Sequence, residues 1–214
     1  MKAYLTTVAT HAKGYCPSFL PSAGTFGWEP VVLGWGRTWP GFGLKLSLVY
    51  HWLRCLPDLN CLVLFTDCHD AVLLADAEAV QRRFRSFRHP LVFSAETNCA
   101  PDPQLAGHYL RSPTRYRFLN SGGFIGEGRY LLDLMERHQI WSCHSRADDQ
   151  RWSTARYLED PRSIRLDTRC EHGIHNHRTH SYPLVFHGNG GSNLRPVLRW
   201  ADLDEDRYQC PVVP

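Results

Sequence analysis

Two carboxylates three residues apart follow an apolar run, in the segment Phe65-Thr66-Asp67-Cys68-His69-Asp70. Val63, Leu64 and Phe65 have no polar neighbour before Thr66, which is typical of a strand buried on both faces of a sheet. Such a strand commonly ends at the ligand-binding edge of an α/β sheet. Two carboxylates there repel each other unless a cation lies between them, and their oxygens suit Mg²⁺ or Mn²⁺. The alternative is that Asp67 and Asp70 cap a turn.

The elements that must position these carboxylates alternate between strand and helix. Besides the strand that ends at Asp67, the hydrophobic periodicity predicts strands at Tyr4–Val8, Pro30–Leu33, Leu91–Ser94 and Leu184–Phe186. It predicts helices at Pro17–Ala23, Leu44–Leu56, Ala77–Phe87, Tyr130 to Trp141 and Asp148–Leu158. Glycine-rich stretches at Gly34–Gly43 and Asn120–Gly126 punctuate this order. The βαβα order predicts one three-layer α/β domain over residues 1–214, with a mainly parallel sheet.

The composition fits an ordinary globular protein. The 214 residues suffice for one domain with a full core, and 43% are hydrophobic and 21% charged. The formal net charge of +3 is too small to argue for nucleic acid, and the scattered arginines indicate a solvated face. No apolar run approaches the length of a membrane span.

The cysteines and histidines give no recognisable metal motif. Eight cysteines form no CxxC pair, so a zinc ribbon is not expected, while one or two disulfides stay open. The irregular stretch at about 169–182 carries four histidines beside Cys170; a metal cluster is one interpretation, but the spacings favour a polar loop.

The stretch from about 200 to 214 is expected to be a tail. The N-terminus reads as a first strand and not as a signal peptide, so as given the chain is expected to be cytoplasmic.

Six motifs occur in order and together resemble one known family. They are Thr7-Val8-Ala9-Thr10, Phe65-Thr66-Asp67-Cys68-His69-Asp70, Phe93-Ser94-Ala95-Glu96, Phe118-Leu119-Asn120-Ser121-Gly122-Gly123-Phe124-Ile125-Gly126, Asp148-Asp149-Gln150 and His187-Gly188-Asn189-Gly190. The chain resembles, from about Leu5 to Asn193, the glycosyltransferase domain of the multifunctional procollagen lysyl hydroxylases (PLOD family). That resemblance implies a GT-A fold, a UDP-sugar donor and Mn²⁺. The iron- and 2-oxoglutarate-dependent hydroxylase module of those proteins has no counterpart in the match.

The resemblance assigns a metal site. Asp67 and Asp70 match the family's acidic metal-binding motif, and His187 matches its third protein ligand. A divalent cation there can neutralise the charge that develops on a leaving nucleoside diphosphate. An imidazole in the ligand set favours manganese over magnesium. The alternative for His187 is an ordinary histidine at a strand end.

Further matching residues imply donor contacts. Thr7 corresponds to a donor-side threonine, Trp39 to a donor-contacting tryptophan in a loop that is shorter here, and Lys45 is placed to contact the diphosphate or ribose. The alternatives are a strand hydroxyl for Thr7 and a surface anchor for Trp39. The small residues would let the backbone approach the donor: Ser121, Gly122 and Gly123 near the sugar, Gly188 and Gly190 near the diphosphate, with an amide contact from Asn189.

Asp148 and Asp149 are the candidate catalytic residues. The match places them facing the sugar and acceptor, where one could orient acceptor hydroxyls or stabilise positive charge at the anomeric carbon. Both begin a predicted helix, so capping is the alternative.

Two positions depart from the family: His69 replaces a tyrosine that stacks on uracil, and Ala100 replaces an acceptor-side aromatic residue. These departures put base affinity and acceptor binding in question.

The resemblance therefore predicts a Mn²⁺-dependent transferase that moves glucose or galactose from UDP to a hydroxyl. The implied acceptor is hydroxylysine or galactosyl-hydroxylysine in a collagen-like chain. A catalytically silent binding domain is the alternative that the two departures support. A metal-dependent phosphohydrolase built on Asp67 and Asp70 ranks last, since no nucleophile accompanies them. The family acts in the endoplasmic reticulum, whereas a viral or bacterial origin would fit a cytoplasmic chain.

Overall fold

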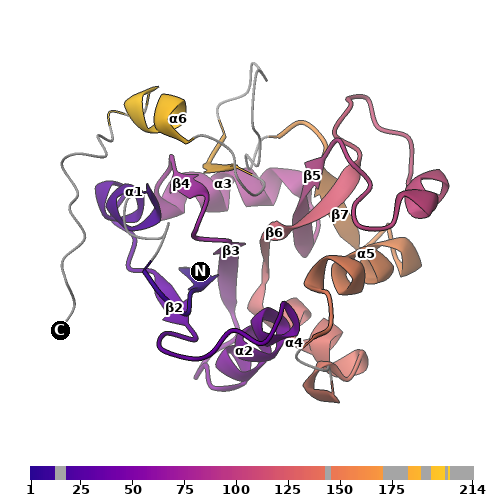
Figure 1. Cartoon of the computed structure of the whole chain (residues 1–214), viewed down its shortest axis with the longest axis horizontal. Helices are drawn as coiled ribbons and strands as arrows, with labels where there is room; N and C mark the ends of the chain where they lie inside the picture. The colour runs from indigo at the N-terminus through magenta and orange to yellow at the C-terminus, as the bar shows by residue number, and fades with distance from the viewer. Residues whose placement is uncertain (13–17, 143–145, 171–182, 189–193, 201, 203–214) are drawn as a thin grey trace.

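A computed structural model describes residues 1–12, 18–142, 146–170, 183–188, 194–200 and 202 of the chain (Figure 1). Its strands are β1 (Lys2–Val8), β2 (Val31–Leu33), β3 (Cys61–Thr66), β4 (Ala71–Leu73), β5 (Leu91–Glu96), β6 (Phe118–Glu127), β7 (Ile164–Asp167) and β8 (Val185–His187). Its α-helices are α1 (Leu20–Thr25), α2 (Gly43–Arg54), α3 (Ala77–Phe87), α4 (Gly128–Arg137), α5 (Asp149–Glu159) and α6 (Arg195–Trp200). Short 3₁₀ helices are η2 (Pro103–His108) and η3 (Ile140–Ser142).

The central sheet has six strands in the order β2-β1-β3-β6-β5-β7. The β1–β2, β1–β3 and β5–β7 pairs are parallel, and β6 runs antiparallel between β3 and β5. The predicted mainly parallel sheet is thus confirmed. A separate two-stranded ribbon pairs β4 with β8, and it brings the far end of the chain back beside β3.

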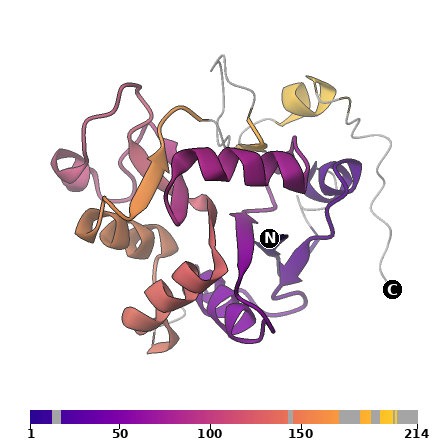
Figure 2. The same ribbon diagram turned by 180° about the vertical axis from the view of Figure 1, so that it is seen from behind.

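Alternate residues of β3 face two different cores, as the pleat of a strand requires. Val63 and Phe65 pack in a cluster with the apolar faces of α2 and α4. Leu62 and Leu64 pack in a second cluster with residues of α1 and α3. Seen from behind, α3 crosses the sheet on the face opposite α2 and α4 (Figure 2). All six residues of β3 are buried, which confirms the two-sided burial predicted from its unbroken apolar run.

The glycine-rich segment Asn120–Gly126 was expected to be a break between elements, and this expectation is wrong. It lies inside β6, between β3 and β5. The glycines are there because side chains from neighbouring elements fill their places. A Cβ on Gly126 would lie 2.8 Å from Cδ1 of Leu91. The glycine-rich composition alone indicates a turn, but here the glycines lie within a strand because neighbouring side chains pack closely against it.

Other predicted elements agree with the structure to within a few residues. The helix predicted from Tyr130 to Trp141 divides into α4 and η3. Besides β6, four elements were not predicted, since each is short or irregular: β4, β7, η2 and α6. Most of the histidine-rich stretch at 169–182 and of the tail at 200–214 lies outside the described residues.

Two predictions from composition can be compared with the described residues. The cysteines at positions 55, 61, 68, 99 and 170 are free thiols. None of the described helices combines the length and hydropathy that a membrane crossing needs.

Candidate functional site

The segment after β3 brings two of the predicted carboxylates to a histidine from the far end of the chain. The backbone N–H of Asp67 donates to the carbonyl of Gly122 at 2.8 Å, which extends the β3–β6 pairing by one step. Asp70 directly precedes β4, and the β4–β8 register sets Ala71 opposite His187. His187 Nε2 therefore lies 3.0 Å from Asp70 Oδ1 and 3.9 Å from Asp67 Oδ2.

Lys45 joins this group to a second carboxylate. It lies in the first turn of α2, and its Nζ is 2.8 Å from Asp67 Oδ1 and 2.7 Å from Asp149 Oδ2. Burial acts to lower the pKa of Lys45, but the charges and hydrogen bonds of both aspartates outweigh it and raise that pKa above its ordinary value. The lysine is therefore a permanent internal cation between two candidate site residues.

The two adjacent acids at the start of α5 have separate roles. Asp148 is the N-cap residue, and its Oδ1 accepts from the backbone N–H of Arg151 at 3.0 Å. Asp149 is buried, and besides Lys45 it accepts from the Ser121 hydroxyl at 2.9 Å. The side-chain oxygen Oε1 of Gln150 accepts from the Ser121 backbone N–H at 2.7 Å, which fixes β6 against α5. Capping thus explains Asp148, whereas Asp149 belongs to the buried polar cluster.

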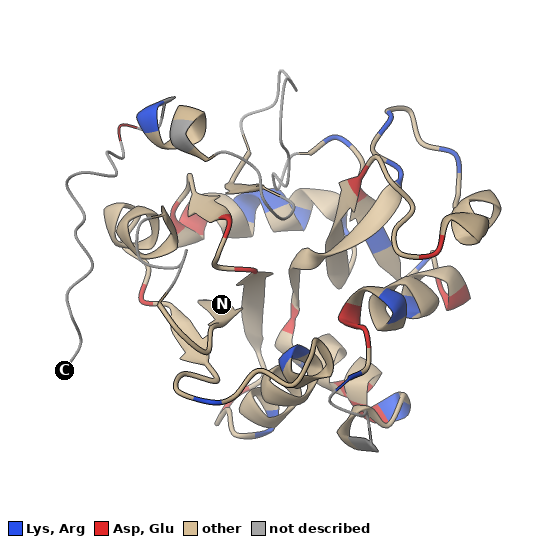
Figure 3. Cartoon of the chain, in the orientation of Figure 1, with Lys and Arg blue, Asp and Glu red and all other residues tan. Residues whose placement is uncertain are grey.

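Two adjoining cavities meet at this cluster. One, of about 410 Å³, is lined by Val8, Thr10, His11, Trp39, Phe42, Lys45, Asp67, Cys68, His69 and Asp70. The other, of about 400 Å³, is lined by Phe42, Lys45, Asp67, Asp70, Glu96, Ala100, Pro101, Asn120, Ser121, Gly122, Asp148, Asp149, Gln150 and His187. We call them the aromatic cavity and the acidic cavity. Figure 3 shows red segments after β3 and at the start of α5, the two sides of the junction.

Aromatic side chains line the first cavity. Trp39 and Phe42 meet edge to face, with ring centroids 5.6 Å apart. His69 packs on His11 at 5.0 Å with tilted rings. His69 therefore lines a cavity that also has other rings in its wall. Flat rings around an open cavity suit a planar base.

The residues predicted to hold a metal partly fit that role. Two carboxylates and an imidazole converge, which is a chemically suitable donor set for Mn²⁺. Gly122 leaves the space between them open, since a Cβ there would lie 2.3 Å from His187 Cε1 and 3.0 Å from Asp67 Oδ2. Among the described residues, however, no three His, Cys, Asp or Glu side chains form a ready metal-binding group. Lys45 holds one oxygen of Asp67.

Other predicted site residues do not line either cavity, or lie outside the residues that the structure describes. Thr7 is fully buried and donates to the carbonyl of Thr66 at 2.7 Å, as a strand hydroxyl does. Gly123 borders a small internal void and not the acidic cavity. Gly188 donates its N–H to the carbonyl of Asp70 at 2.7 Å. Asn189 and Gly190 are outside the described residues.

Three residues that the prediction did not assign also belong to the site. Glu96 ends β5 and lines the acidic cavity, where it accepts from Asn120 Nδ2 at 3.0 Å. Its signal was present, because Glu96 is a carboxylate at a strand end just as Asp67 is. Asn120 Oδ1 also accepts from the Gly122 backbone N–H at 2.9 Å, and so helps to hold the backbone of this part of β6. Phe42 lines both cavities, and no motif marks it.

Cys68 lies between the two metal-motif carboxylates but serves the fold. Its side chain is fully buried, and its thiol donates to the carbonyl of Val8 at 3.5 Å. Burial raises the pKa of this thiol to about 12. Cys68 is therefore a protonated link between the ends of β1 and β3 and not a thiolate ligand.

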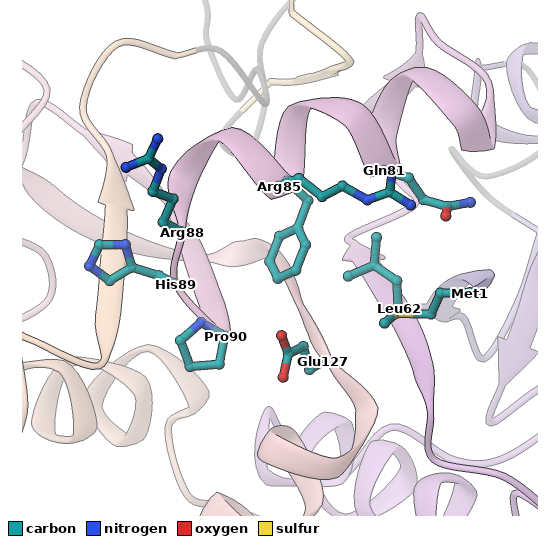
Figure 4. Close-up of a pocket in the computed structure, with 9 residues that line it drawn as sticks. Met1, Leu62, Gln81, Arg85, Arg88, His89, Pro90 and Glu127 are labelled. Carbon is teal, nitrogen blue, oxygen red and sulfur yellow. The ribbon is translucent and has the colours of Figure 1, made fainter.

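A further cavity of about 330 Å³ lies at the other end of β3. Figure 4 shows Arg85 of α3, Arg88 just after that helix, and Glu127, the last residue of β6, among the side chains that line it. Leu62, near the start of β3, lines it, whereas Asp67 follows the end of that strand. The predicted site residues that the structure describes line none of this cavity.

Comparison with known proteins identifies the family of this chain. The model of the PLOD GT domain matches residues 1–173. Procollagen-lysine,2-oxoglutarate 5-dioxygenase 2 of Mus musculus is 32% identical over 183 residues, which are 79% of this chain and 24% of that protein. Multifunctional procollagen lysine hydroxylase and glycosyltransferase LH3 of Homo sapiens is 28% identical over 228 residues, 91% of this chain and 30% of that protein.

Among solved structures, mouse xyloside xylosyltransferase 1 in its apo form matches with a TM-score of 0.44 and 13% identity over 69% of this chain and 64% of that one. The chain spans 24% and 30% of the length of the two curated relatives. The family model itself spans most of the chain, and the sheet has the mixed, mainly parallel order expected for its fold. The chain belongs to the PLOD GT domain family, a glycosyltransferase family of GT-A-type α/β fold.

Proposed function

We propose that this domain transfers glucose or galactose from a UDP-sugar to a hydroxyl acceptor and needs a divalent metal, preferably Mn²⁺. One observation carries the proposal: Lys45 bridges Asp67 and Asp149 where the aromatic and acidic cavities meet. A cation at the junction of a ring-lined and a carboxylate-lined space suits a ligand with a base at one end, a diphosphate in the middle and a sugar at the other.

Each part of the ligand then has its own partners. The uracil would lie among His11, Trp39 and His69, whose rings offer flat apolar surface. The diphosphate would lie at Lys45, whose ammonium has three N–H donors, two of which bond Asp67 and Asp149. The sugar would lie on Ser121 and Gly122, which line the acidic cavity.

Asp67, Asp70 and His187 would hold the metal. When bound, a divalent cation supplies positive charge that stabilises the leaving diphosphate. These side chains are close enough to act on one ligand, since His187 Nε2 lies 3.0 Å and 3.9 Å from the two carboxylates.

The protein's own groups supply orientation. Lys45 and Ser121 fix Asp149 by bonds of 2.7 Å and 2.9 Å, so its carboxylate has one position. A fixed carboxylate beside the sugar can accept a hydrogen bond from a hydroxyl or stabilise positive charge at the anomeric carbon. Asp148, at the cavity wall, is placed to orient the acceptor hydroxyl. We assign no covalent nucleophile.

The names of the relatives support a class of acceptor. The curated proteins carry procollagen lysine in their names, and we propose hydroxylysine or galactosyl-hydroxylysine of a collagen-like chain as the acceptor here. Either one offers the free hydroxyl that the transfer requires.

The decisive experiment measures UDP release from UDP-glucose and UDP-galactose, with Mn²⁺, with Mg²⁺ and with a chelator. We expect release with Mn²⁺, less with Mg²⁺ and none with chelator. The double variant Asp67→Asn/Asp70→Asn should lose this activity, and its metal-dependent quenching of tryptophan fluorescence should also disappear. Turnover that persists in that variant would refute the metal site. Binding of UDP without release from either donor would instead support the catalytically silent domain.

A further inference from the structure

The loop between β5 and β6 forms part of the wall of the acidic cavity. It runs from residue 97 to residue 117 and contributes Ala100 and Pro101 to that wall. The start of α5 contributes the N-cap residue Asp148 and the two residues that follow it. The shape of the cavity therefore depends on where the first half of this loop lies relative to the start of α5.

The second half of the loop is held by several contacts. The Arg117 guanidinium donates to the carbonyls of Ala106, Tyr109 and Leu110 at 2.9, 2.9 and 3.1 Å. The Tyr109 ring is buried and stacks on Tyr157 of α5, with ring centroids 5.3 Å apart. A movement of this half would therefore break its packing against α5.

The first half of the loop depends on one pair of side chains. Cys99 packs against the hydrophobic core. Within the part of the chain that the structure describes, Arg151 of α5 is the one residue outside the loop that hydrogen-bonds to residues 97–102. Its partner is Asp102, which directly follows Pro101. The segment that lines the cavity is thus attached to α5 through this pair.

The pair has the geometry of a specific contact. Arg151 Nε donates to Asp102 Oδ2 at 2.8 Å, and Arg151 Nη2 donates to Asp102 Oδ1 at 3.1 Å. Two parallel bonds fix the orientation of the two groups as well as their distance. The hydrogen bonds from Arg151 lower the pKa of Asp102 below its ordinary value, so the carboxyl group stays ionised. Arg151 is 57% exposed, so solvent screens the pair and its effect is expected to be moderate.

Arg151 also contacts the candidate site through its backbone. Its N–H donates to Oδ1 of Asp148 at 3.0 Å, in the first turn of α5. One residue therefore connects the loop to the turn that carries Asp148. Neither Asp102 nor Arg151 is among the residues that line the acidic cavity. Both can thus affect a ligand there only through the wall that they hold.

We propose that Asp102 and Arg151 are positioning residues: they hold Ala100 and Pro101 in place relative to Asp148, and so set the affinity of the acidic cavity for the acceptor. The donor side does not depend on this pair, because Ser121 is held by Asp149 and Gln150. The inference rests on the proposed function, since it takes Asp148 as the residue that orients the acceptor. It adds two residues outside the cavity that control the KM for one substrate.

The test is a double-mutant cycle with Asp102→Asn, Arg151→Gln and both changes together. KM and kcat are measured with UDP-glucose and UDP-galactose as donors and with hydroxylysine and galactosyl-hydroxylysine as acceptors. We expect each single change to raise the acceptor KM about 3- to 10-fold, with kcat and the donor KM unchanged. The double variant should resemble either single variant, because each change alone removes the whole contact.

The matched control is Glu78→Gln. Glu78 pairs with Arg82 on the exposed face of α3, and neither residue lines the aromatic or the acidic cavity. This change also removes an exposed ion pair, so it should leave the acceptor KM at the wild-type value. A rise in KM that is equal in the control and in Asp102→Asn would overturn the role of the pair.

Three other outcomes would also overturn the proposal. They are an unchanged acceptor KM in both single variants, an equal rise in donor and acceptor KM, and effects that add in the double variant. If wild type releases no UDP, the proposed function fails, and the pair is judged by amide exchange at Leu105. The N–H of Leu105 donates to the Asp102 carbonyl at 3.0 Å. Faster exchange in both single variants would show that the pair holds the loop, and unchanged exchange would refute it.

Discussion

At the end of β3 the polar side chains are buried or partly buried and are joined by contacts of 2.7 to 3.0 Å, whereas in the aromatic cavity Trp39 and Phe42 are exposed by 41% and 54%. The first region is a network in which the positive charge of Lys45 balances the negative charges of Asp67 and Asp149. The second consists of rings in contact with one another and with solvent. Removing one member of the network should disturb all of it, whereas a change of one ring should alter only the affinity for one ligand.

The largest effect is expected from Lys45→Met. This change leaves Asp67 and Asp149 close together without their cation, and breaking a buried ion pair costs about 3–5 kcal/mol. We expect a loss of that order in the free energy of unfolding in urea, and a fall in UDP release of at least about 100-fold. Lys2→Met is the matched control, since Lys2 is exposed. A Lys45→Met protein as stable as that control would show that the network is not a structural unit.

A second test removes space and not charge. Gly122→Ala places a methyl group 2.3 Å from His187 Cε1, and this histidine has little room to move because it is 4% exposed. We expect a destabilisation of about 1–3 kcal/mol, typical of overpacking, together with weaker Mn²⁺ binding by calorimetry. Gly107→Ala is the control, since no atom lies within 4 Å of the new Cβ. Similar melting curves for both variants would contradict close packing at Gly122.

The sequence identified the members of the network but not their connections. Asp67, Asp70, His187, Lys45 and Asp149 were each assigned from a motif or from the family resemblance. That Lys45 bridges two of them depends on how α2 is set against β3 and α5, which no local pattern encodes. His187 reaches Asp70 through the pairing of β4 with β8, and both strands have three residues, too short for a clear periodic signal.

The errors share a physical cause. Asn120–Gly126 was expected to be a break because glycine favours turns, yet packing against Leu91 and His187 requires glycine within a strand. Phe42 carried no signal, since a single aromatic residue in a loop reads as core or surface alike. The sequence therefore pointed to residues that the structure brings together, and it missed features that depend on the packing of a distant segment.

In the aromatic cavity a smaller effect is expected from His69→Tyr. Tyrosine offers a larger ring than imidazole, so we expect UDP to bind about 3- to 10-fold more tightly, measured by calorimetry. The melting temperature should not change, because His69 is exposed and the network lies elsewhere. His108→Tyr, the same exchange at an exposed position of η2, should leave UDP affinity unchanged. Weaker UDP binding in His69→Tyr would mean that His69 does not face the base.

The smallest effect concerns Glu96, which lies at the edge of the network. Burial raises its pKa above the ordinary 4.5, against the opposing influence of the Asn120 hydrogen bond and of His187. A carboxyl group with a higher pKa in the folded state stabilises the fold when protonated, and this contribution is lost as the pH rises from about 4.5 through the folded pKa. Glu96→Gln keeps an acceptor for Asn120 without the charge. It should therefore melt about 1–2 °C above wild type at pH 7.5 and at nearly the same temperature at pH 4. If the variant is less stable than wild type at pH 7.5, the negative charge of Glu96 must be compensated by the polar network. Glu96 would then be a member of that network and not a residue at its edge.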